Sequence, residues 1–341
     1  MRAVAALRII CSTAILSVGL QATTAVAGCG QHPGYQPVSG TRTSVIELKP
    51  SPELAALGQR LFFDTRFSAT GATACARCHE PGYAYTTPLR ANRSDNGRPG
   101  RRNSPSLLDV GFRPALMWDG RFCSLEQQAL GPFESGEMGI SVEHAIERVR
   151  SDPKYVDMFQ RALGSFPSVD GFTRALAGYQ RTLFSRESRV DRFLAGNEPQ
   201  VLSPPERHGL DVFTKRAGCT NCHQLYPVLP DGLRSPRALL TDFRFHNIGI
   251  GYQGDRNPDP GRYAQSRDAA DWGAFLTPSL RNVARTAPYM HDGSFTRLED
   301  VVEFYSAGAR RVPNLSPQIR PLHLDGAEKA ALVAFLRALS N

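Results

Sequence analysis

Two short segments of this 341-residue sequence combine residue types that can hold a metal-containing cofactor. They are residues 75–79 (CARCH) and 219–223 (CTNCH). Two thiols at this spacing attach a haem by forming thioethers to its vinyl groups, and the adjoining histidine is placed to ligate the iron. We therefore predict two covalent c-type haems. The attaching thiols are Cys75, Cys78, Cys219 and Cys222, and the proximal iron ligands are His79 and His223.

The second axial position on each iron decides the chemistry, because a filled position suits electron transfer and an open one can bind peroxide. The sequence has eight histidines, and none lies in residues 80–142, the stretch that follows the first motif. We therefore expect the iron of the N-terminal haem to be open. His246 and His291 are expected near the C-terminal haem as hydrogen-bonded structural residues.

Residues 298–305 are predicted to form an amphipathic helix with a tyrosine on its apolar face. Leu298, Val301 and Val302 share that face with Tyr305, so Tyr305 points inward. It is either a buried tyrosine whose hydroxyl bonds a carbonyl or an axial ligand of the C-terminal haem. Periodicity alone favours the first interpretation.

Matching helical segments precede the two motifs and must position them. A serine–proline pair opens each segment, at residues 51–52 and 203–204, as an N-cap followed by a proline at the first helical position. Gly58 and Gly209 occupy corresponding places. The chain is therefore predicted to repeat one small haem-binding module.

The rest of the chain adds helices and loops rather than sheet. Asp325 and Glu328 form a capping-box pattern that opens a C-terminal helix, and no alternating strand pattern stands out. We predict a mainly α fold of two cytochrome c-like haem domains with long loops. The N-terminal, peroxidatic domain spans 29–195 and the C-terminal, electron-transfer domain spans 196–341.

The N-terminus indicates export. Arg2 and Arg8 precede an apolar stretch and small residues, which predicts a signal peptide over residues 1–28. Cleavage at its Ala-Val-Ala end would release a soluble periplasmic protein. Residues 26–29 also resemble a lipobox, which would leave a lipid anchor on Cys29. Both outcomes place the folded chain in the periplasm, on a membrane only if Cys29 is lipidated.

Charge and cysteine content leave few other classes of protein. The formal net charge is +8, yet no long basic run exists and the chain is exported, so we expect no nucleic-acid partner. A disulfide framework is the alternative interpretation of the seven cysteines, but it does not require a histidine after each close pair. Cys123, outside both motifs, is expected to be a buried free thiol.

Several further motifs occur in the order found in one bacterial family. Residues 277–293 (TPSLRNVARTAPYMHDG), 118–121 (WDGR) and 126–132 (EQQALGP) resemble the signature of the dihaem cytochrome c peroxidase/MauG superfamily. The resemblance covers essentially the whole mature chain. It implies that the axial ligand of the second haem lies in the helix after the His-Asp-Gly segment, as Met in peroxidases and Tyr in MauG-type enzymes. Tyr305 stands there, with Met290 as packing, and Asp95 stands roughly where peroxidases carry a distal histidine.

The same resemblance implies roles for residues outside the haem motifs. Trp118 corresponds to the tryptophan between the haems. Glu137 corresponds to the acid/base of the peroxide pocket, with Gln128 and Pro132 lining it. Asn103, Thr286 and Pro288 correspond to the ligands of a calcium ion between the domains.

The resemblance implies a MauG-like enzyme. Hydrogen peroxide would react at the N-terminal haem, and a partner protein would be oxidised by long-range electron transfer through the C-terminal haem. The alternative is a cytochrome c peroxidase supplied with electrons by a small c-type cytochrome or cupredoxin. A third interpretation is a non-catalytic dihaem electron-transfer protein.

Overall fold

The computed structural model describes residues 49–229, 231–254 and 257–341. The predicted signal peptide and Cys29 lie outside these residues. Within them the chain is mostly helical, which confirms the predicted fold class. The helices are α1 (Pro52–Phe63), α2 (Cys75–Cys78), α3 (Leu125–Glu134), α4 (Val142–Arg150), α5 (Pro153–Leu163), α6 (Val169–Arg181), α7 (Arg189–Leu194), α8 (Pro204–Asp211), α9 (Tyr263–Ser266), α10 (Leu298–Ser306) and α11 (Gly326–Ala338).

Shorter elements connect these helices. A π-helical turn (Val212–Arg216) extends α8, and one antiparallel pair joins β1 (Phe245–His246) to β2 (Phe275–Leu276). The 3₁₀ turns are Thr65–Phe67, Pro81–Tyr83, Val110–Phe112, Cys219–Asn221, Ala269–Asp271 and Val283–Arg285. None of the helices in the described part of the chain is long and apolar enough to cross a membrane.

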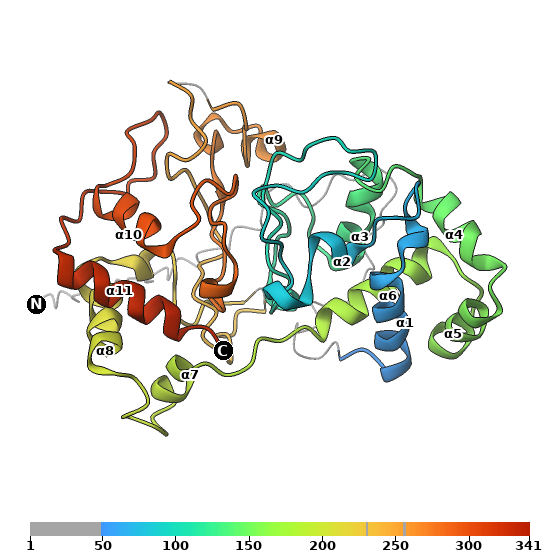
Figure 1. Ribbon diagram of the computed structural model, residues 1–341, viewed down its shortest axis with the longest axis horizontal. Helices are drawn as coiled ribbons and strands as arrows, with labels where there is room; N and C mark the ends of the chain where they lie inside the picture. Colours follow the sequence, from blue (N-terminus) through green and yellow to red (C-terminus); the bar gives the residue numbers. More distant parts are fainter. Residues whose placement is uncertain (1–48, 230, 255–256) are drawn as a thin grey trace, which may run out of the picture.

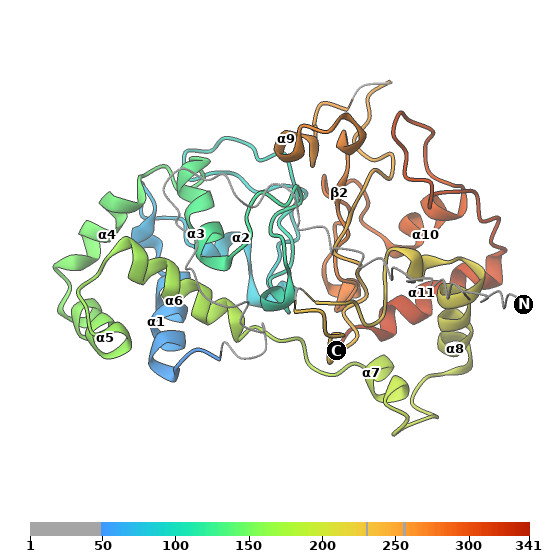
Figure 2. The same ribbon diagram turned by 180° about the vertical axis from the view of Figure 1, so that it is seen from behind.

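The molecule has two lobes, each with its own hydrophobic core (Figures 1 and 2). One core draws its buried side chains from residues 57–183 and the other from residues 190–339. Helix α7 contributes Val190 to the second core. We therefore propose that the domains divide before α7, a few residues ahead of the predicted division at 195 and 196.

Each lobe packs the helix that precedes its motif against a long helix at a glycine. Helix α1 lies on α6, where a Cβ at Gly58 would come within 1.9 Å of the carbonyl oxygen of Ala175. Helix α8 lies on α11, where a Cβ at Gly209 would come within 2.0 Å of the carbonyl oxygen of Ala331. Only glycine allows such an approach of two backbones. The paired glycines of the sequence are thus the contact points of a repeated helix pair.

The ends of these helices follow the predicted capping patterns. The Ser51 hydroxyl accepts a hydrogen bond from the amide of Leu54 at 3.1 Å. Ser203 and Glu206 form a capping box on α8, and Asp325 and Glu328 form another on α11. These caps satisfy amides that have no partner within the helix.

Long loops fill the space between the lobes. Both ribbon views place the loop after α2 beside the loops that surround β1 and β2 (Figures 1 and 2). The amide of Asn103 donates to the carbonyl of His291, and Arg102 pairs with Asp259 across the same boundary at 2.7 Å. The candidate site residues outside the helices lie mostly on these loops.

A buried ion network joins the lobes behind the loops. Arg237 pairs with Asp109 at 2.8 Å, and Arg281 pairs with Asp191 at 2.7 Å. Arg281 also donates to the carbonyls of Ala238 and Arg186, at 2.9 Å each. The contacts therefore tie the C-terminal lobe to a carboxylate of the N-terminal lobe and to α7.

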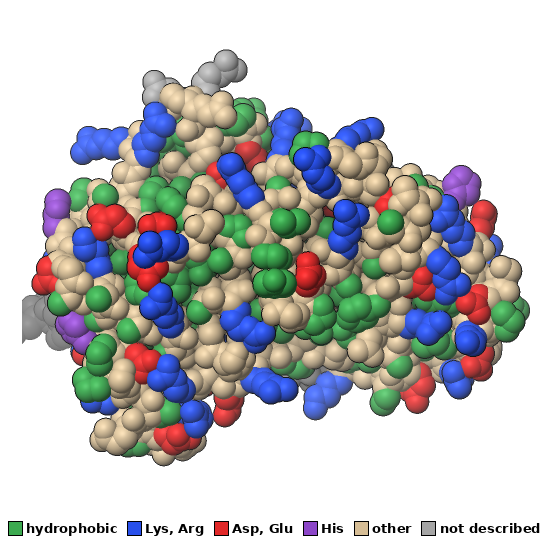
Figure 3. Space-filling model, viewed as in Figure 1, with side chains coloured by type: hydrophobic (Ala, Val, Ile, Leu, Met, Phe, Trp, Pro, Cys, Tyr) green, Lys and Arg blue, Asp and Glu red, His purple; other side chains and the backbone are tan. Residues whose placement is uncertain are grey.

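The charged surface is mixed. On the face drawn in Figure 3, Lys and Arg side chains are spread across the molecule and stand among Asp and Glu side chains. The net positive charge of the sequence is thus dispersed over this face.

Candidate functional site

The first motif presents two thiols and a histidine at one end of a short helix. Cys75 and Cys78 lie on α2, and the amide of His79 closes the turn by donating to the Cys75 carbonyl at 3.1 Å. The Nδ1 atom of His79 is 3.0 Å from the carbonyl oxygen of Tyr85. An Nδ1–H donor at that contact leaves the Nε2 lone pair for a metal. Burial lowers the pKa of His79 to about 4, which keeps the ring in its neutral, ligating form.

The second motif repeats this arrangement on a 3₁₀ turn. The amide of His223 donates to the Cys219 carbonyl at 2.8 Å, and its Nδ1 is 2.9 Å from the carbonyl oxygen of Leu240. Burial lowers the pKa of His223. Two thiols and an oriented neutral imidazole are the donor set that a c-type haem needs. The residues at both motifs therefore fit the predicted group.

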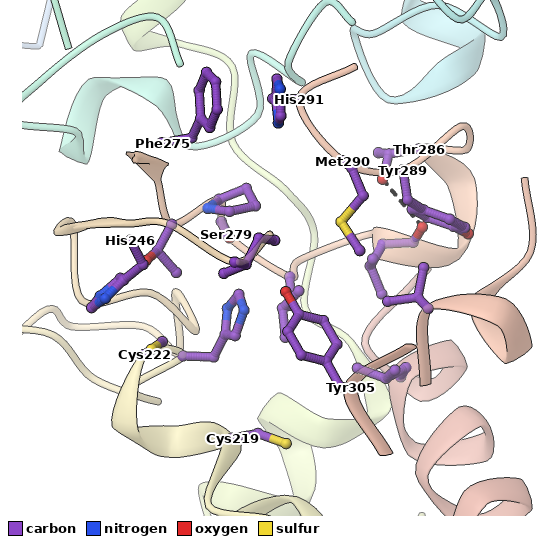
Figure 4. A pocket seen from close by; sticks show the side chains of 18 of the residues that line it. Cys219, Cys222, His246, Phe275, Ser279, Thr286, Tyr289, Met290, His291 and Tyr305 are labelled. Carbon is purple, nitrogen blue, oxygen red and sulfur yellow. Dashed lines mark hydrogen bonds between the residues drawn. The ribbon is translucent and has the colours of Figure 1, made fainter. Parts of the chain in front are cut away.

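A large, mainly apolar cavity opens beside the second motif. Figure 4 shows Cys219, Cys222 and Tyr305 around it, with Met290 and Thr286 on the other side. Its wall continues into the loops of the N-terminal lobe and includes residues 103–106, Arg113 and Trp118. One cavity therefore runs from the C-terminal motif to the boundary between the lobes.

Tyr305 extends from α10 into this cavity. In Figure 4 its hydroxyl points toward the cavity rather than into the helix packing. Among the described residues that hydroxyl has no hydrogen-bond partner, so the buried tyrosine bonded to a carbonyl is not what the structure presents. Burial raises the pKa of Tyr305. A bound cation would oppose this effect, because coordination favours the deprotonated ligand.

Met290 borders the same cavity. Its thioether side chain reaches into the space between the loop of residue 290 and Tyr305 (Figure 4). Met290 is predicted from the sequence to be a packing residue. Its position would also allow its sulfur to approach a haem attached at the second motif. The choice between Tyr305 and Met290 as the axial ligand remains a prediction.

Two of the residues predicted for the peroxide pocket lie on α3, and the third follows its C-terminal end. Gln128 and Pro132 lie on α3, and the amide of Met138 donates to the Pro132 carbonyl at 3.0 Å, which folds Glu137 back beside the helix. Glu137 is exposed by area, yet protein atoms crowd its carboxyl and this desolvation raises its pKa; Arg121 and Ser135 partly offset the effect. Its charge also acts on Cys78, so it lies near the first motif.

Asp95 lies beside Glu137, because its amide donates to the Glu137 carbonyl at 2.7 Å. Its carboxylate accepts hydrogen bonds from the amide and hydroxyl of Thr70, both at 2.7 Å. Burial acts to raise the pKa of Asp95, but these and other hydrogen bonds outweigh it and lower the pKa to about 2. Asp95 therefore ties two loops together.

Trp118 lies on the cavity wall at the boundary between the lobes, and its carbonyl accepts from the amide of Leu276 at 2.9 Å. Its indole N–H donates to the carbonyl of Asn103 at 2.8 Å, and its ring meets His291 edge to face at a centroid distance of 6.4 Å. His291 stacks on Phe275, with centroids 3.5 Å apart (Figure 4). Burial lowers the pKa of His291 to about 4. His291 thus supports the aromatic group rather than carrying a charge.

The three residues predicted to bind calcium border the same cavity. Asn103, Thr286 and Pro288 all contribute to its wall. The side-chain amide nitrogen of Asn103 donates to the Leu89 carbonyl at 3.0 Å, which leaves Oδ1 as the acceptor atom. Amide and carbonyl oxygens suit a hard cation. The residues therefore fit the ion, whose presence stays a prediction.

Two further groups differ from the sequence-based expectations or extend them. His246, predicted to be hydrogen-bonded, pairs with Asp242 at 2.8 Å; burial acts to lower its pKa, but the Asp242 contact raises it to about 9. Cys123 was expected to be a free thiol, and this prediction is wrong, because Cys123 is in a disulfide. The other four described cysteines are free thiols. Pairing is the ordinary fate of thiols in an oxidising compartment.

Known proteins resemble this chain in both sequence and fold. Residues 52–199 match the family model described as "Di-haem cytochrome c peroxidase". The methylamine utilization protein MauG of Methylorubrum extorquens is 36% identical over 292 residues, which cover 85% of this chain and 78% of that protein. A cytochrome-c peroxidase of Pseudomonas sp. (strain SCT) is 34% identical over 351 residues, 96% of this chain and 91% of that protein.

A solved structure gives the same result. The crystal structure of a MauG-like protein associated with microbial copper homeostasis superposes with a TM-score of 0.76 at 32% identity, over 91% of this chain and 95% of that one. The shared sequence extends over both lobes and both motifs. The chain belongs to the di-haem cytochrome c peroxidase/MauG family, and it is an oxidoreductase with two c-type haems.

Proposed function

We propose that this enzyme reacts with hydrogen peroxide at the N-terminal haem and oxidises a partner protein through the C-terminal haem, as MauG-type enzymes do. The observation that supports this most is Tyr305, whose hydroxyl faces the cavity beside Cys219 and Cys222. A phenolate is an anionic axial ligand, and such ligands depress the reduction potential of a haem relative to methionine.

The N-terminal lobe supplies the peroxide side of this proposal. A haem iron with an open axial position supplies the site where a peroxide can bind and be reduced. No histidine is present between residues 80 and 142 to close it. Glu137, with its raised pKa, can take up and return a proton near the first motif. Gln128 and Pro132 hold the adjoining wall.

The boundary between the lobes supplies the connection. Trp118 lies in the cavity wall at the boundary between the lobes, and its indole N–H is hydrogen-bonded to the Asn103 carbonyl. We propose that its ring carries electrons between the haems. Its N–H is bonded to a carbonyl, which is not a base, so the ring would keep its proton when it is oxidised. The proposed calcium ion would hold Asn103 in place from the other side.

The same proposal implies a kind of partner and a cellular compartment. Apolar wall residues surround the C-terminal motif, so a large partner would exchange electrons with the haem over a distance rather than enter the cavity. Export places the enzyme in the periplasm. A lipid anchor on Cys29 remains the alternative to a soluble protein.

A cytochrome c peroxidase is the second candidate. Met290 favours it, since its thioether also borders the cavity and methionine is the axial ligand that peroxidases of this family use. The relative from Pseudomonas sp. (strain SCT) carries the peroxidase name.

One experiment separates the two candidates. The ferric protein is mixed with one equivalent of hydrogen peroxide, and its absorption is followed with and without a reduced small c-type cytochrome. The MauG-like proposal predicts a spectral change that persists for minutes and only slow oxidation of the cytochrome. Rapid, catalytic oxidation of the cytochrome would contradict it and favour the peroxidase. No response to peroxide would contradict both.

A further inference from the structure

Arg113 is a buried cation at the boundary between the lobes. It follows the 3₁₀ turn Val110–Phe112, whose first carbonyl accepts its backbone amide at 3.0 Å. Its side chain borders the cavity together with Ser104, Pro105 and Ser106. The residue is half-buried by area because one side opens onto the cavity, while protein surrounds the rest of its guanidinium.

The buried guanidinium of Arg113 makes few hydrogen bonds. It can donate five hydrogen bonds, and among the described residues it makes one, to the carbonyl of Ser106 at 2.9 Å. Burial lowers the pKa of Arg113 to about 10, which reflects the cost of keeping this charge away from water. An uncompensated buried charge is strongly destabilising, so a site of this kind normally holds an anion.

The neighbouring arginines do have carboxylate partners. Arg237 pairs with Asp109, and Arg281 pairs with Asp191. Asp109 is the carboxylate whose field acts on Arg113, but its oxygens already bond Arg237 and the hydroxyl of Ser185. Within the described part of the chain, Arg113 is therefore left without a bonded counterion.

Arg113 also lies close to the first motif. The hydroxyl of Ser106, whose carbonyl accepts from Arg113, donates to the carbonyl of Ala84. The next residue, Tyr85, has its carbonyl oxygen 3.0 Å from Nδ1 of His79. A haem carries two propionate carboxylates, and a planar guanidinium binds a carboxylate with two parallel hydrogen bonds.

We propose that Arg113 binds a propionate carboxylate of the N-terminal haem and thereby raises the reduction potential of that haem. The inference rests on the assignment of the first motif as a haem site. The ion pair offsets the negative charge of the propionate beside the iron. Without the cation, the uncompensated carboxylate stabilises the oxidised, more positive iron, so the midpoint potential falls.

The test compares Arg113→Gln, Arg113→Lys and the wild type as full-length holoproteins. Arg101→Gln is the matched control, because Arg101 is an exposed arginine of the same loop. Haem content is measured as the pyridine haemochrome, and both midpoint potentials by spectroelectrochemical titration. We expect Arg113→Gln to raise the ratio of oxidised to reduced N-terminal haem at a fixed potential about tenfold, equivalent to ~59 mV. Arg113→Lys should give a smaller shift, because it keeps the charge and loses the fork.

Three results would overturn the proposal. The first is a midpoint potential of the N-terminal haem in Arg113→Gln and Arg113→Lys that equals the value in Arg101→Gln. The second is a shift confined to the C-terminal haem, which would assign the carboxylate to that haem. The third is a wild-type protein with fewer than two haems, which would remove the haem assignment itself. If Arg113→Gln does not fold, an unshifted Arg113→Lys still contradicts the proposal.

Discussion

The immediate surroundings of each motif histidine and of Glu137 determine its protonation state. A backbone carbonyl lies against Nδ1 of His79 and of His223, so each imidazole is oriented in the same way. Glu137 differs from most surface carboxylates, because the atoms crowded around its carboxyl raise its pKa. A carboxyl with a raised pKa exchanges protons more readily at working pH, which suits an acid/base role.

Replacing Glu137 with Gln tests that role. We expect the rate of reaction with hydrogen peroxide to fall by roughly 10² to 10⁴, the usual contribution of a positioned acid/base group. Stopped-flow absorption after peroxide addition measures the rate. Glu147→Gln, at an exposed position on α4, is the control and should leave the rate unchanged. Equal rates in both variants would remove Glu137 from the mechanism.

At the scale of single residues, the sequence predicted where the haems are attached better than it predicted the surroundings of each side chain. The spacing of Cys75, Cys78 and His79 predicts a haem site directly, because those residues are close together along the chain. The counterion-free setting of Arg113 depends on loops that are distant in sequence, and no local pattern predicts it. The pairing of Cys123 was likewise not predicted, because a disulfide depends on tertiary contacts that no local pattern shows.

Each motif follows one helix of a packed pair, and each pair depends on one glycine. Gly58 and Gly209 allow α1 and α8 to touch the backbones of α6 and α11. The sequence revealed the glycines as a repeat, although it could not show which helix lies opposite. That information is in tertiary packing, because each glycine meets a residue that is distant along the chain: Gly58 meets Ala175, 117 positions later, and Gly209 meets Ala331, 122 positions later.

Gly58→Ala and Gly209→Ala should each destabilise one lobe. The new Cβ would lie about 2 Å from a backbone oxygen, which cannot rotate away. We expect a loss of ~1–3 kcal/mol in the free energy of unfolding, the range for overpacked cores. Urea unfolding followed by circular dichroism measures it. Gly326→Ala is the control, because a Cβ there meets open space. A variant as stable as this control would show that the helices can separate without cost.

Charge joins the two lobes where Arg237 pairs with Asp109, and it ties α7 to the rest of the C-terminal lobe where Arg281 pairs with Asp191. The side chain of Arg281 is only 4% exposed and reaches the carboxylate of Asp191. Burial acts to raise the pKa of Asp191, but hydrogen bonds from Arg281 and Ser188 outweigh it and lower the pKa. A carboxyl whose pKa is lowered by folding stabilises the fold at pH values above the pKa that it has in the unfolded chain, ~3.9. It loses that contribution as the pH falls through the pKa of the folded state.

Arg281→Gln should therefore cost stability in a pH-dependent way. We expect a loss of ~3 kcal/mol at pH 7, because buried carboxylates lose their cation. The deficit should shrink as the pH falls below ~4 and the carboxyls become protonated. Urea midpoints between pH 3 and 7 measure both effects. Arg161→Gln, which breaks an exposed pair with Asp157, should change little. A deficit that does not vary with pH would contradict the role of Asp191.

The most direct test of the proposed function is the ligation of the C-terminal haem. Electron paramagnetic resonance and absorption spectra of the ferric wild type are compared with those of Tyr305→Phe and Met290→Leu. If Tyr305 is the axial ligand, Tyr305→Phe changes the signal of the C-terminal haem alone, and Met290→Leu matches the wild type. An unchanged Tyr305→Phe spectrum together with an altered Met290→Leu spectrum would contradict the MauG-like assignment and identify a peroxidase.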